Sequence, residues 1–350
     1  MRSKKKQTSN LWIFLVLLIF KFSSVSATDI SVDASAPSKS IKMDDIAFGY
    51  HHNRFYFEQT PAFKRAHDII NEATHKRKPI KYVRLQNILT YLENPDGSLK
   101  NYTEQRAGHC YDTDRYPSGY NWIKVNEVYD ELVTRSGLIP IIEFNYMPLC
   151  LASDRNNIGS YGLANISPPS DYEEWQEVCS NIASHLQNRY GVQETRKWYW
   201  GVWNEPDHRY FWNSGLWEFV KLYDYTAQGI LSAESNLKFG GPDAAGMGDY
   251  TRLVIDHTRN GTNYATGEIG SKFDYVPVHA YNNSPRGICK TIWEAAGYIR
   301  GVYSSSYSNK KILVTETAPN WGMRVHYLHC LLYTSPSPRD LSTSRMPSSA

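Results

Sequence analysis

The feature that most constrains this chain is an alternation, repeated seven times, of short apolar runs with longer amphipathic segments. The apolar runs predict buried β-strands, and the amphipathic segments between them predict helices. Strands that alternate with helices form a parallel sheet with right-handed crossovers, either as a doubly wound sheet or as a closed barrel. The predicted strands are 45–50, 81–86, 139–145, 198–204, 237–241, 273–279 and 311–315.

The positions of the polar residues separate these two architectures. Site residues gathered from many successive strand ends are typical of a TIM barrel, whereas a doubly wound sheet binds at one switch point and usually has a Gly-rich first loop. The sequence has no G-x-G-x-x-G, P-loop, G-x-S-x-G or H-E-x-x-H motif. We therefore predict an α/β fold, a (β/α)8 TIM barrel. The strand-end candidates are His51, His52, Arg84, Gln86, Glu143, Asn145, Asn204, Glu205, His279 and Glu316.

Helix-starting and helix-ending residues lie between the predicted strands. Thr60-Pro61 starts one helix, with proline at the first helical position. The segment Ser170-Asp171-Tyr172-Glu173 is a capping box, and Gly191 ends the helix that it starts. The segment 122–136 ends at Gly137 in the same way.

The predicted barrel is incomplete at its C-terminal side. Only 34 residues follow Glu316, and the last twenty contain six serines, three prolines and no periodic apolar pattern. This tail resembles a translated cloning adaptor, and a genuine flexible tail is the alternative. We predict a catalytic domain over 28–330, truncated after about strand seven, and a non-native or disordered tail over 331–350. The missing eighth strand would leave the edges of strands one and seven unpaired.

Residues 1–27 have the composition of a secretory signal peptide. A basic head precedes the apolar run 11–20, and small residues follow at 25–27. Ten apolar residues are too few for a membrane span, which needs about 20. We expect cleavage, no membrane association afterwards, and a lysosomal or extracellular location; an uncleaved type II anchor is the alternative.

The net charge of the chain, +3, comes from its two ends. Without 1–27 and 331–350 the chain has 31 basic and 34 acidic side chains, a net charge of −3. No basic stripe then remains, so nucleic acid is excluded as a predicted partner. An apolar content of 41% excludes an intrinsically disordered chain.

The five cysteines are widely spaced and form no C-x-x-C pair, so neither a zinc site nor a thioredoxin motif is predicted. A Cys110–Cys150 disulfide is possible in an oxidising compartment, but the sequence alone cannot pair them. Cys179 lies on the apolar face of a predicted helix and is assigned to the core. N-glycosylation sequons begin at Asn101, Asn165, Asn260 and Asn282, consistent with a secretory route.

Two glutamates end predicted strands that are far apart in the sequence. Pro206 ends strand four directly after Glu205, and the neighbouring Trp200 and Trp203 are expected to form an apolar wall that raises the pKa of a general acid. Glu316 ends strand seven after an apolar run. Two carboxylates at one barrel mouth are the arrangement of a glycosidase pair.

These motifs resemble a known family. An N-E-P motif on strand four with a second glutamate on strand seven resembles the four/seven superfamily of retaining glycoside hydrolases. The segments GVWNEPDHRYFW, NGTNYATGEIGSKFDYVPVHAY and ETAPNWG resemble glycoside hydrolase family 39, and they are closer to its α-L-iduronidases than to its β-xylosidases. The resemblance extends over about 45–321, most of the mature chain.

The resemblance implies roles for individual residues. Glu205 would be the acid/base and Glu316 the nucleophile, with carboxyl groups about 5–5.5 Å apart in a retaining enzyme. Asn204 would bind the sugar 2-hydroxyl, and Arg84 would keep Glu316 ionised. The resemblance also implies that His279 and His208 line the sugar pocket and that Trp321 and Gly322 line its rim.

Two positions depart from the iduronidase pattern. Tyr281 stands where those enzymes have a lysine that holds the uronate carboxylate, and Gln86 stands where they have a histidine. Losing a cation from a carboxylate clamp disfavours a uronide substrate. The three sequence blocks nevertheless favour the iduronidases, and on that resemblance we predict an exo-acting α-L-iduronidase-type glycosidase for glycosaminoglycan-like glycans, with no cofactor or metal. A β-xylosidase of the same family and a secreted carbohydrate-binding pseudoenzyme are the alternatives, and the sequence does not indicate the oligomeric state.

Several candidates also have structural interpretations. Glu143 is more plausible as a buried partner of Arg84 than as a catalytic group. His51, His52 and His208 divide evenly between pocket contacts and structural histidines. Among the aromatic residues, Trp203 and Trp321 are the predicted site aromatics, and GGPDAAGMG after strand five is predicted to be a loop.

Overall fold

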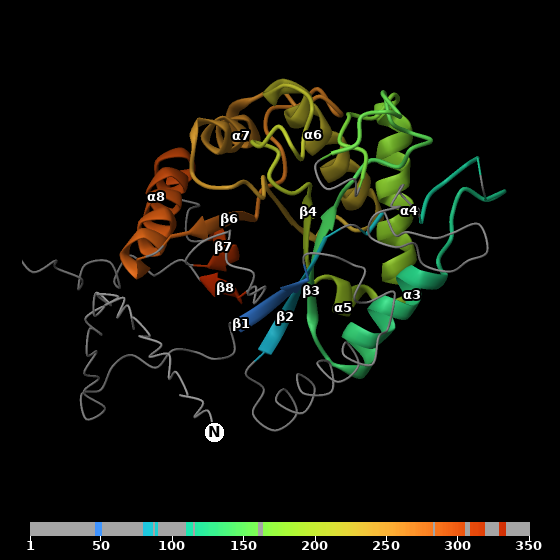
Figure 1. The fold of residues 1–350 in the computed structure, drawn as a ribbon, viewed down its shortest axis with the longest axis horizontal. Coiled ribbons are helices and arrows are strands. Elements are labelled where there is room, and N and C mark those ends of the chain that lie inside the picture. Colours follow the sequence, from blue (N-terminus) through green and yellow to red (C-terminus); the bar gives the residue numbers. More distant parts are fainter. Residues whose placement is uncertain are drawn as a thin grey trace, which may run out of the picture. The chain divides into compact units, whose positions relative to one another are not determined.

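A computed structural model describes residues 46–50, 80–86, 88–89, 110–114, 116–159, 164–282, 284–304, 309–318 and 329–333. In it the strands form a closed barrel in which sequence neighbours are also spatial neighbours (Figure 1). The predicted (β/α)8-type architecture is therefore confirmed. The strands are β1 (Ile46–Tyr50), β2 (Ile80–Leu85), β3 (Ile139–Phe144), β4 (Tyr199–Val202), β5 (Lys238–Gly240), β6 (Tyr275–Tyr281), β7 (Lys311–Ala318) and β8 (His329–Tyr333).

The first seven strands are parallel, and each lies within a few residues of a predicted strand. The shortest ladder joins β5 to β6 through a single residue pair, Gly240 and Tyr275. A Cβ on Gly240 would overlap the carbonyl oxygen of Tyr275, so the close approach of these strands requires glycine there.

The prediction that the edges of strands one and seven stay unpaired is wrong. β8 pairs antiparallel with both β1 and β7 and closes the barrel. A parallel strand needs a crossover of a dozen or more residues, whereas only the segment 319–328 separates β7 from β8. The apolar residues of β8 suit a short return strand, although 331–333 were assigned to the tail. The described chain thus has seven parallel strands and no eighth β/α unit.

The described helices lie around the outside of the barrel (Figure 1). Two long helices, α4 and α6, pack against each other through buried residues such as Trp175, whose indole N–H donates to Thr226 Oγ1 (2.8 Å). Cys179 is buried on the same face of α4, as predicted. Fully burying one large apolar side chain contributes about 1.5–3 kcal/mol. The helices are α3 (Ile123–Tyr129), the π-helical η2 (Asp130–Arg135), α4 (Tyr172–Tyr190), α5 (Val192–Thr195), α6 (Leu216–Ala233), α7 (Asp249–Asn260) and α8 (Pro285–Tyr303).

The N-terminus of α4 differs by one residue from the predicted capping box. Asp171 is the N-cap, and its carboxylate accepts from the backbone N–H of Glu174 (2.9 Å). The hydroxyl of Ser170 instead donates to the Leu151 carbonyl (3.1 Å), so it is not available for capping. Gly191 ends the helix at φ +88, as predicted. The predicted helix start at Thr60-Pro61 lies outside the described residues.

Cysteine pairing and glycosylation also differ from expectation. Cys110 and Cys150 are free thiols rather than a disulfide. Asn165 is completely buried, and its side-chain amide donates to the Asp154 carbonyl (2.6 Å). Because a glycan acceptor must be accessible, this sequon does not mark a glycan on the folded chain. No helix among the described residues is long and apolar enough to span a membrane.

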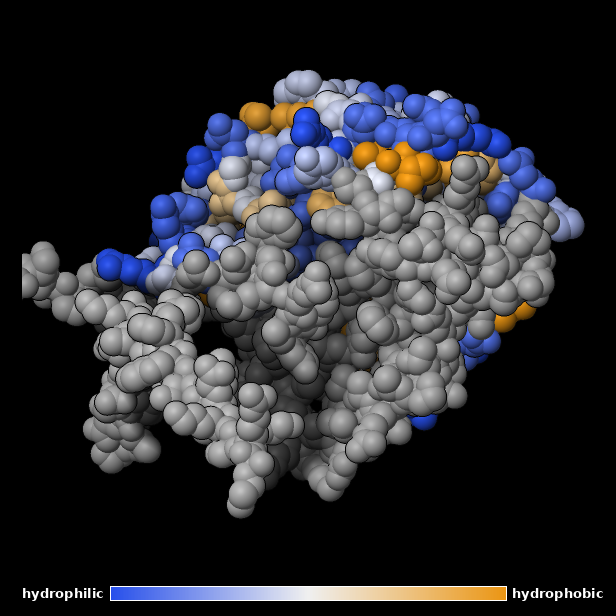
Figure 2. Space-filling model, in the orientation of Figure 1, coloured by the Kyte–Doolittle hydropathy of each residue, from blue (hydrophilic) through white to orange (hydrophobic). Residues whose placement is uncertain are grey.

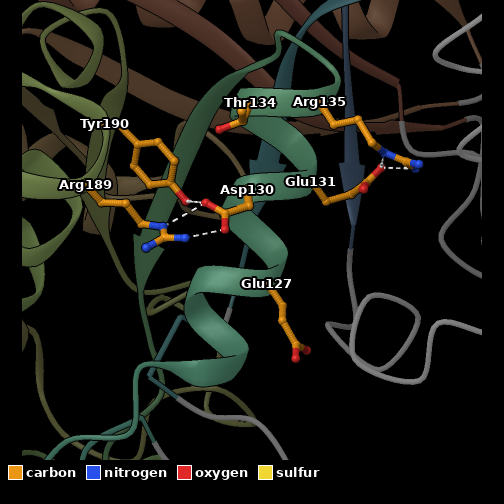
Figure 3. Close-up of a pocket in the computed structure, with 7 residues that line it drawn as sticks. All are labelled: Glu127, Asp130, Glu131, Thr134, Arg135, Arg189 and Tyr190. Atoms are coloured by element: carbon orange, nitrogen blue, oxygen red, sulfur yellow. Dashed lines mark hydrogen bonds and ion pairs between the residues drawn. The ribbon is translucent and has the colours of Figure 1, made fainter.

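The described outer surface mixes hydrophilic residues with small hydrophobic patches (Figure 2). Figure 3 shows a cleft beside η2, where Arg189 and Tyr190 bind Asp130 and where Arg135 pairs with Glu131. The pair of Arg189 with Asp130 joins α4 to η2, whereas the pair of Arg135 with Glu131 lies within η2. Exposed ion pairs of this kind contribute at most about 1 kcal/mol each to stability.

Candidate active site

A strained turn after β4 places Glu205 at the carboxyl end of the barrel. Trp203 and Glu205 have backbone φ angles of 65° and 43°, which residues other than glycine rarely adopt. Each such residue costs about 1–3 kcal/mol and persists where the surroundings over-determine it. The backbone N–H of Glu205 donates to the Asp243 carbonyl (2.6 Å), which fixes the turn to the loop after β5. The Glu205 side chain keeps 16% of its surface exposed.

Glu316 lies within β7 and is almost completely buried. Its Oε1 accepts from Arg84 Nη1 (2.7 Å) and from the Gln86 amide (3.2 Å). Its Oε2 accepts from the Tyr281 hydroxyl. Donors from β2, the residue that follows β2, and β6 therefore converge on this carboxylate, and the Arg84 charge favours its ionised form.

His279 on β6 connects the two glutamates. Its Nδ1 lies 2.7 Å from Glu205 Oε1 and 3.5 Å from Glu316 Oε2, and its Nε2 lies 3.2 Å from Asp243 Oδ1. Carboxylate oxygens of Glu205 and Glu316 lie within 4.8 Å of each other and of the histidine. Residues 111 positions apart in the sequence thus form one site because β6 is adjacent to β7 and the β4 turn faces both.

Both ring nitrogens of His279 face carboxylate oxygens, an arrangement that suits a ring with a proton on each nitrogen. Burial alone would lower the pKa of His279, but the charges of Glu316 and Asp243 raise it well above its usual range. These charges favour the imidazolium form of His279.

Arg84 is the second cation of the site and is 1% exposed. Its guanidinium donates to Glu143, to Asp243, to Glu316 and to Asn204 Oδ1 (2.8 Å). Burial opposes its charge, yet the carboxylates of Asp243, Glu143 and Glu316 raise the pKa of Arg84 well above its ordinary value. The expected contact of Arg84 with Glu143 is present, as is its contact with Glu316.

Two residues of this network were not singled out from the sequence. Asp243 follows the Gly241-Pro242 pair in a segment that reads only as a loop, yet it contacts both cations. Tyr146 is buried and hydrogen-bonds Asn204; burial is the first cause that raises its pKa. Neither residue has a periodic apolar pattern or a motif of its own, so position in three dimensions is the only signal.

Asn204 and Gln86 lie beside the two glutamates. The Gln86 amide donates to Asn204 Oδ1 (3.1 Å) as well as to Glu316. Asn204 is 1% exposed and is oriented by Arg84 and Gln86. Burial and the Glu316 charge raise the pKa of Tyr281, so its hydroxyl remains a donor to the glutamate.

Other predicted site residues have no described side-chain contact with Glu205 or Glu316. His208 is exposed and packs against the rings of Tyr210 (4.9 Å) and Phe211 (5.8 Å). The prediction that Trp203 is a site aromatic is wrong, because its ring is completely buried and its N–H donates to the Phe211 carbonyl (2.7 Å). Trp200 is buried against Trp198. Four further candidates lie outside the described residues: His51, His52, Trp321 and Gly322.

Glu205, Glu316 and His279 have the composition and spacing of a possible divalent-metal site. In the structure, however, the donor atoms are engaged with one another, and Nδ1 of His279 faces both carboxylates. Carboxyl and imidazole groups in such contact are also the groups that acid, base and nucleophilic catalysis use.

Comparison with known proteins places this site in a family. The family model of the glycosyl hydrolases family 39 matches residues 80–312. A β-xylosidase of Caldicellulosiruptor saccharolyticus is 34% identical over 173 residues, 49% of this chain and 33% of the relative. An α-L-iduronidase of Canis lupus familiaris is 38% identical over 111 residues, 30% of this chain and 17% of the relative. The chain therefore spans a third or less of the length of these curated relatives.

Solved structures agree in fold. A family 39 β-xylosidase from Caulobacter crescentus matches with a TM-score of 0.58 and 21% identity, over 80% of this chain and 55% of its own. A bacterial orthologue of human α-L-iduronidase matches with a TM-score of 0.57 and 18% identity, over 79% of this chain and 41% of its own. Because the family model covers well over half of the sequence, the chain belongs to glycosyl hydrolases family 39.

Proposed function

We propose that this family 39 glycosyl hydrolase removes a terminal sugar from a glycan with retention of configuration, with Glu205 as acid/base and Glu316 as nucleophile. The observation that carries the proposal is the approach of their carboxylate oxygens to within 4.8 Å. Inverting enzymes need about 6.5–9.5 Å to place a water between the two groups, whereas retaining enzymes need about 5–5.5 Å between the carboxyl groups.

In the first step the ionised Glu316 attacks the anomeric carbon while Glu205 gives its proton to the glycosidic oxygen. The C–O bond to the leaving group breaks, and an ester bond to Glu316 forms. Arg84 and Tyr281 bind Glu316 from two sides, which orients the carboxylate for attack. The partial exposure of Glu205 lets it reach the leaving group from the open end of the barrel.

In the second step Glu205 accepts a proton from a water that attacks the anomeric carbon. The ester bond breaks, and Glu316 returns to its ionised form. Two inversions at one carbon give overall retention. Asn204 directly precedes Glu205 and accepts from Arg84 through Oδ1, and its amide can bind the sugar 2-hydroxyl.

The sugar itself has two candidates. The sequence blocks favour an α-L-iduronide, and the relatives include both α-L-iduronidases and β-xylosidases. The contacts of Tyr281 favour a neutral sugar, because this residue points its hydroxyl at Glu316 where a lysine would hold a uronate. The cations that contact the glutamates in the described part of the site, Arg84 and His279, are already bound to carboxylates. We therefore place a β-D-xyloside beside the iduronide as a full candidate.

The test is hydrolysis of aryl α-L-iduronide and aryl β-D-xyloside by the purified protein, with the anomeric form of the first product followed by NMR. Retention on either substrate supports the proposal, and the ratio of the two kcat/KM values identifies the sugar. An inverted first product would contradict it. Loss of turnover on both substrates, with sugar binding intact in Glu316→Gln, would favour a carbohydrate-binding pseudoenzyme.

The mechanism also predicts how the two glutamate variants differ. With an activated aryl leaving group, which needs no acid, Glu205→Gln should still form the glycosyl ester and accumulate it, because the base for the second step is missing. Glu316→Gln should form no ester. Intact-protein mass spectrometry distinguishes the two variants. An ester in both, or in neither, would contradict these assignments.

We also propose that residues 1–27 direct the chain into the secretory pathway, toward a lysosomal or extracellular location. Expression in eukaryotic cells tests this, with cleavage after Ala27 as the expected result. Of the described sequons, those at Asn260 and Asn282 have exposed side chains and should accept glycans, whereas Asn165 should not. An uncleaved, membrane-bound chain would overturn the proposal.

A further inference from the structure

Beneath the two catalytic glutamates, a second pair of acids shares one donor. Glu143 and Asp243 are 3% and 1% exposed. Both reach the Nε–H of Arg84, Glu143 through Oε1 and Asp243 through Oδ2 (3.0 Å). An arginine Nε carries a single hydrogen, so it cannot satisfy two carboxylate ions at once. Two buried carboxylates that share one donor hydrogen repel each other when both are ionised, and this repulsion favours a proton on one of them.

The remaining contacts show which acid keeps the charge. Both oxygens of Asp243 have donors: Oδ2 accepts from Arg84, and Oδ1 accepts from the Thr315 hydroxyl and faces Nε2 of His279. Glu143 contacts Arg84 through Oε1 and lies against Asp243, and its buried Oε2 has no hydrogen-bond partner among the described residues. A carboxylate ion with one unsatisfied buried oxygen is far less stable than one bound on both sides.

We propose that Glu143 and Asp243 share one proton, that the proton lies on Glu143, and that the ionised Asp243 is a positioning residue that holds Arg84 and His279 under the catalytic glutamates. The charged groups facing Asp243 are Arg84 from β2, Glu143 from β3 and His279 from β6. The same two cations also contact the carboxylates of Glu205, after β4, and Glu316, on β7. With Glu143 neutral and Glu205 carrying its proton, two cations balance two anions.

The directions of the titrations agree with this assignment. Burial raises the pKa of Glu143 well above its ordinary value, and a hydrogen bond to Asp243 adds to the rise. Burial also opposes the charge of Asp243, yet Arg84, His279 and the hydrogen bond from Glu143 bring its pKa below its ordinary value.

The first experiment measures urea unfolding of the wild type and Glu143→Gln from about pH 5 to about pH 8. Above about pH 4.3, the unfolded wild type releases the proton that the folded protein keeps on Glu143. The unfolding constant of the wild type, relative to the variant, should therefore rise by up to about tenfold per pH unit until the folded pKa is reached. The matched variant Glu268→Gln, at an exposed glutamate, should show no such slope.

An ionised Glu143 would give a flat ratio over the same range, and that result would overturn the proposal. If Glu143→Gln does not fold, infrared spectroscopy of the Glu205→Gln protein with ¹³C-labelled carboxyl groups decides. A protonated-carboxyl band at neutral pH that shifts with labelled glutamate supports the proposal. A shift with labelled aspartate, or no band, contradicts it. The inference deepens the proposed function, on which its catalytic meaning rests. Both measurements need no substrate, so the two can fail separately.

Discussion

Replacing Arg84 by lysine tests how far the site depends on a forked cation rather than on positive charge alone. Arg84 donates to four side chains from a fixed plane, whereas a lysine ammonium has three donors on one atom. The variant should lose at least two charge-assisted hydrogen bonds. Each contributes about 1.5–3 kcal/mol, so the free energy of unfolding should fall by about 3–6 kcal/mol.

The effect on catalysis follows from the bond to Glu316. Losing that bond alone, at about 1.5–3 kcal/mol, should reduce kcat/KM by roughly 10- to 150-fold. Urea unfolding and initial rates on the better aryl glycoside measure the two effects. Arg189→Lys is the matched control, because its ion pair with Asp130 is about 40% exposed and should contribute at most about 1 kcal/mol. Arg84→Lys with the stability and rate of the control would refute the reasoning.

Three further changes have expected outcomes. His279→Gln should destabilise the protein most below about pH 6.5, where the raised pKa of the folded histidine gives its full stabilisation. The difference in unfolding free energy between wild type and variant, measured by urea unfolding at several pH values, should shrink as the pH rises through the folded pKa, and a growing difference would contradict the imidazolium. Tyr281→Phe removes a donor to Glu316 and should lower kcat/KM by roughly 10- to 100-fold. Tyr281→Lys should raise the ratio of the iduronide rate to the xyloside rate, and an unchanged ratio would argue that this position does not bind the uronate carboxylate. Gly229→Ala places a Cβ against the carbonyl of Gln176 at the α4–α6 contact and should lower the free energy of unfolding by about 1–3 kcal/mol. The Cβ of Gly297→Ala on α8 has no atom outside its own helix within 4 Å, so this variant should be stabilised by about 0.5–1 kcal/mol. Thermal or urea unfolding measures both, and equal effects would contradict the packing argument.

Local patterns in the sequence predicted the elements that they control directly. Apolar runs followed by polar residues located the seven parallel strands, and the strand ends brought Arg84, Glu205, His279 and Glu316 into consideration. Each of these residues lies where its own strand places it, so a one-dimensional pattern is sufficient. The strand β8 was not predicted at all, because its pairing depends on the length of the connection to β7 and on a free barrel edge, which no local pattern records.

The residues that were misjudged depend on convergence in three dimensions. Asp243 has an ordinary loop sequence around it, and its importance comes from Arg84, Thr315 and His279, which lie on three other strands. Trp203 has the reverse history. It lies two residues before Glu205, the proposed acid/base, but the positive φ of the turn directs its ring into the core, where it packs against Trp212 and Tyr146.

The exchange of roles by Glu205 during turnover follows from an asymmetry in donors. Two carboxylates within 4.8 Å of each other resist being ionised together. Glu316 receives donors from Arg84, Gln86 and Tyr281, whereas the described contact of the Glu205 carboxylate is with His279. On the proposed mechanism the pair therefore keeps its negative charge on Glu316 and its proton on Glu205, as the first step requires. Once Glu316 is esterified its charge is gone, and so is the repulsion that kept the proton on Glu205. The Nδ1 of His279 then faces one carboxylate instead of two, which favours an ionised Glu205 when water has to be activated.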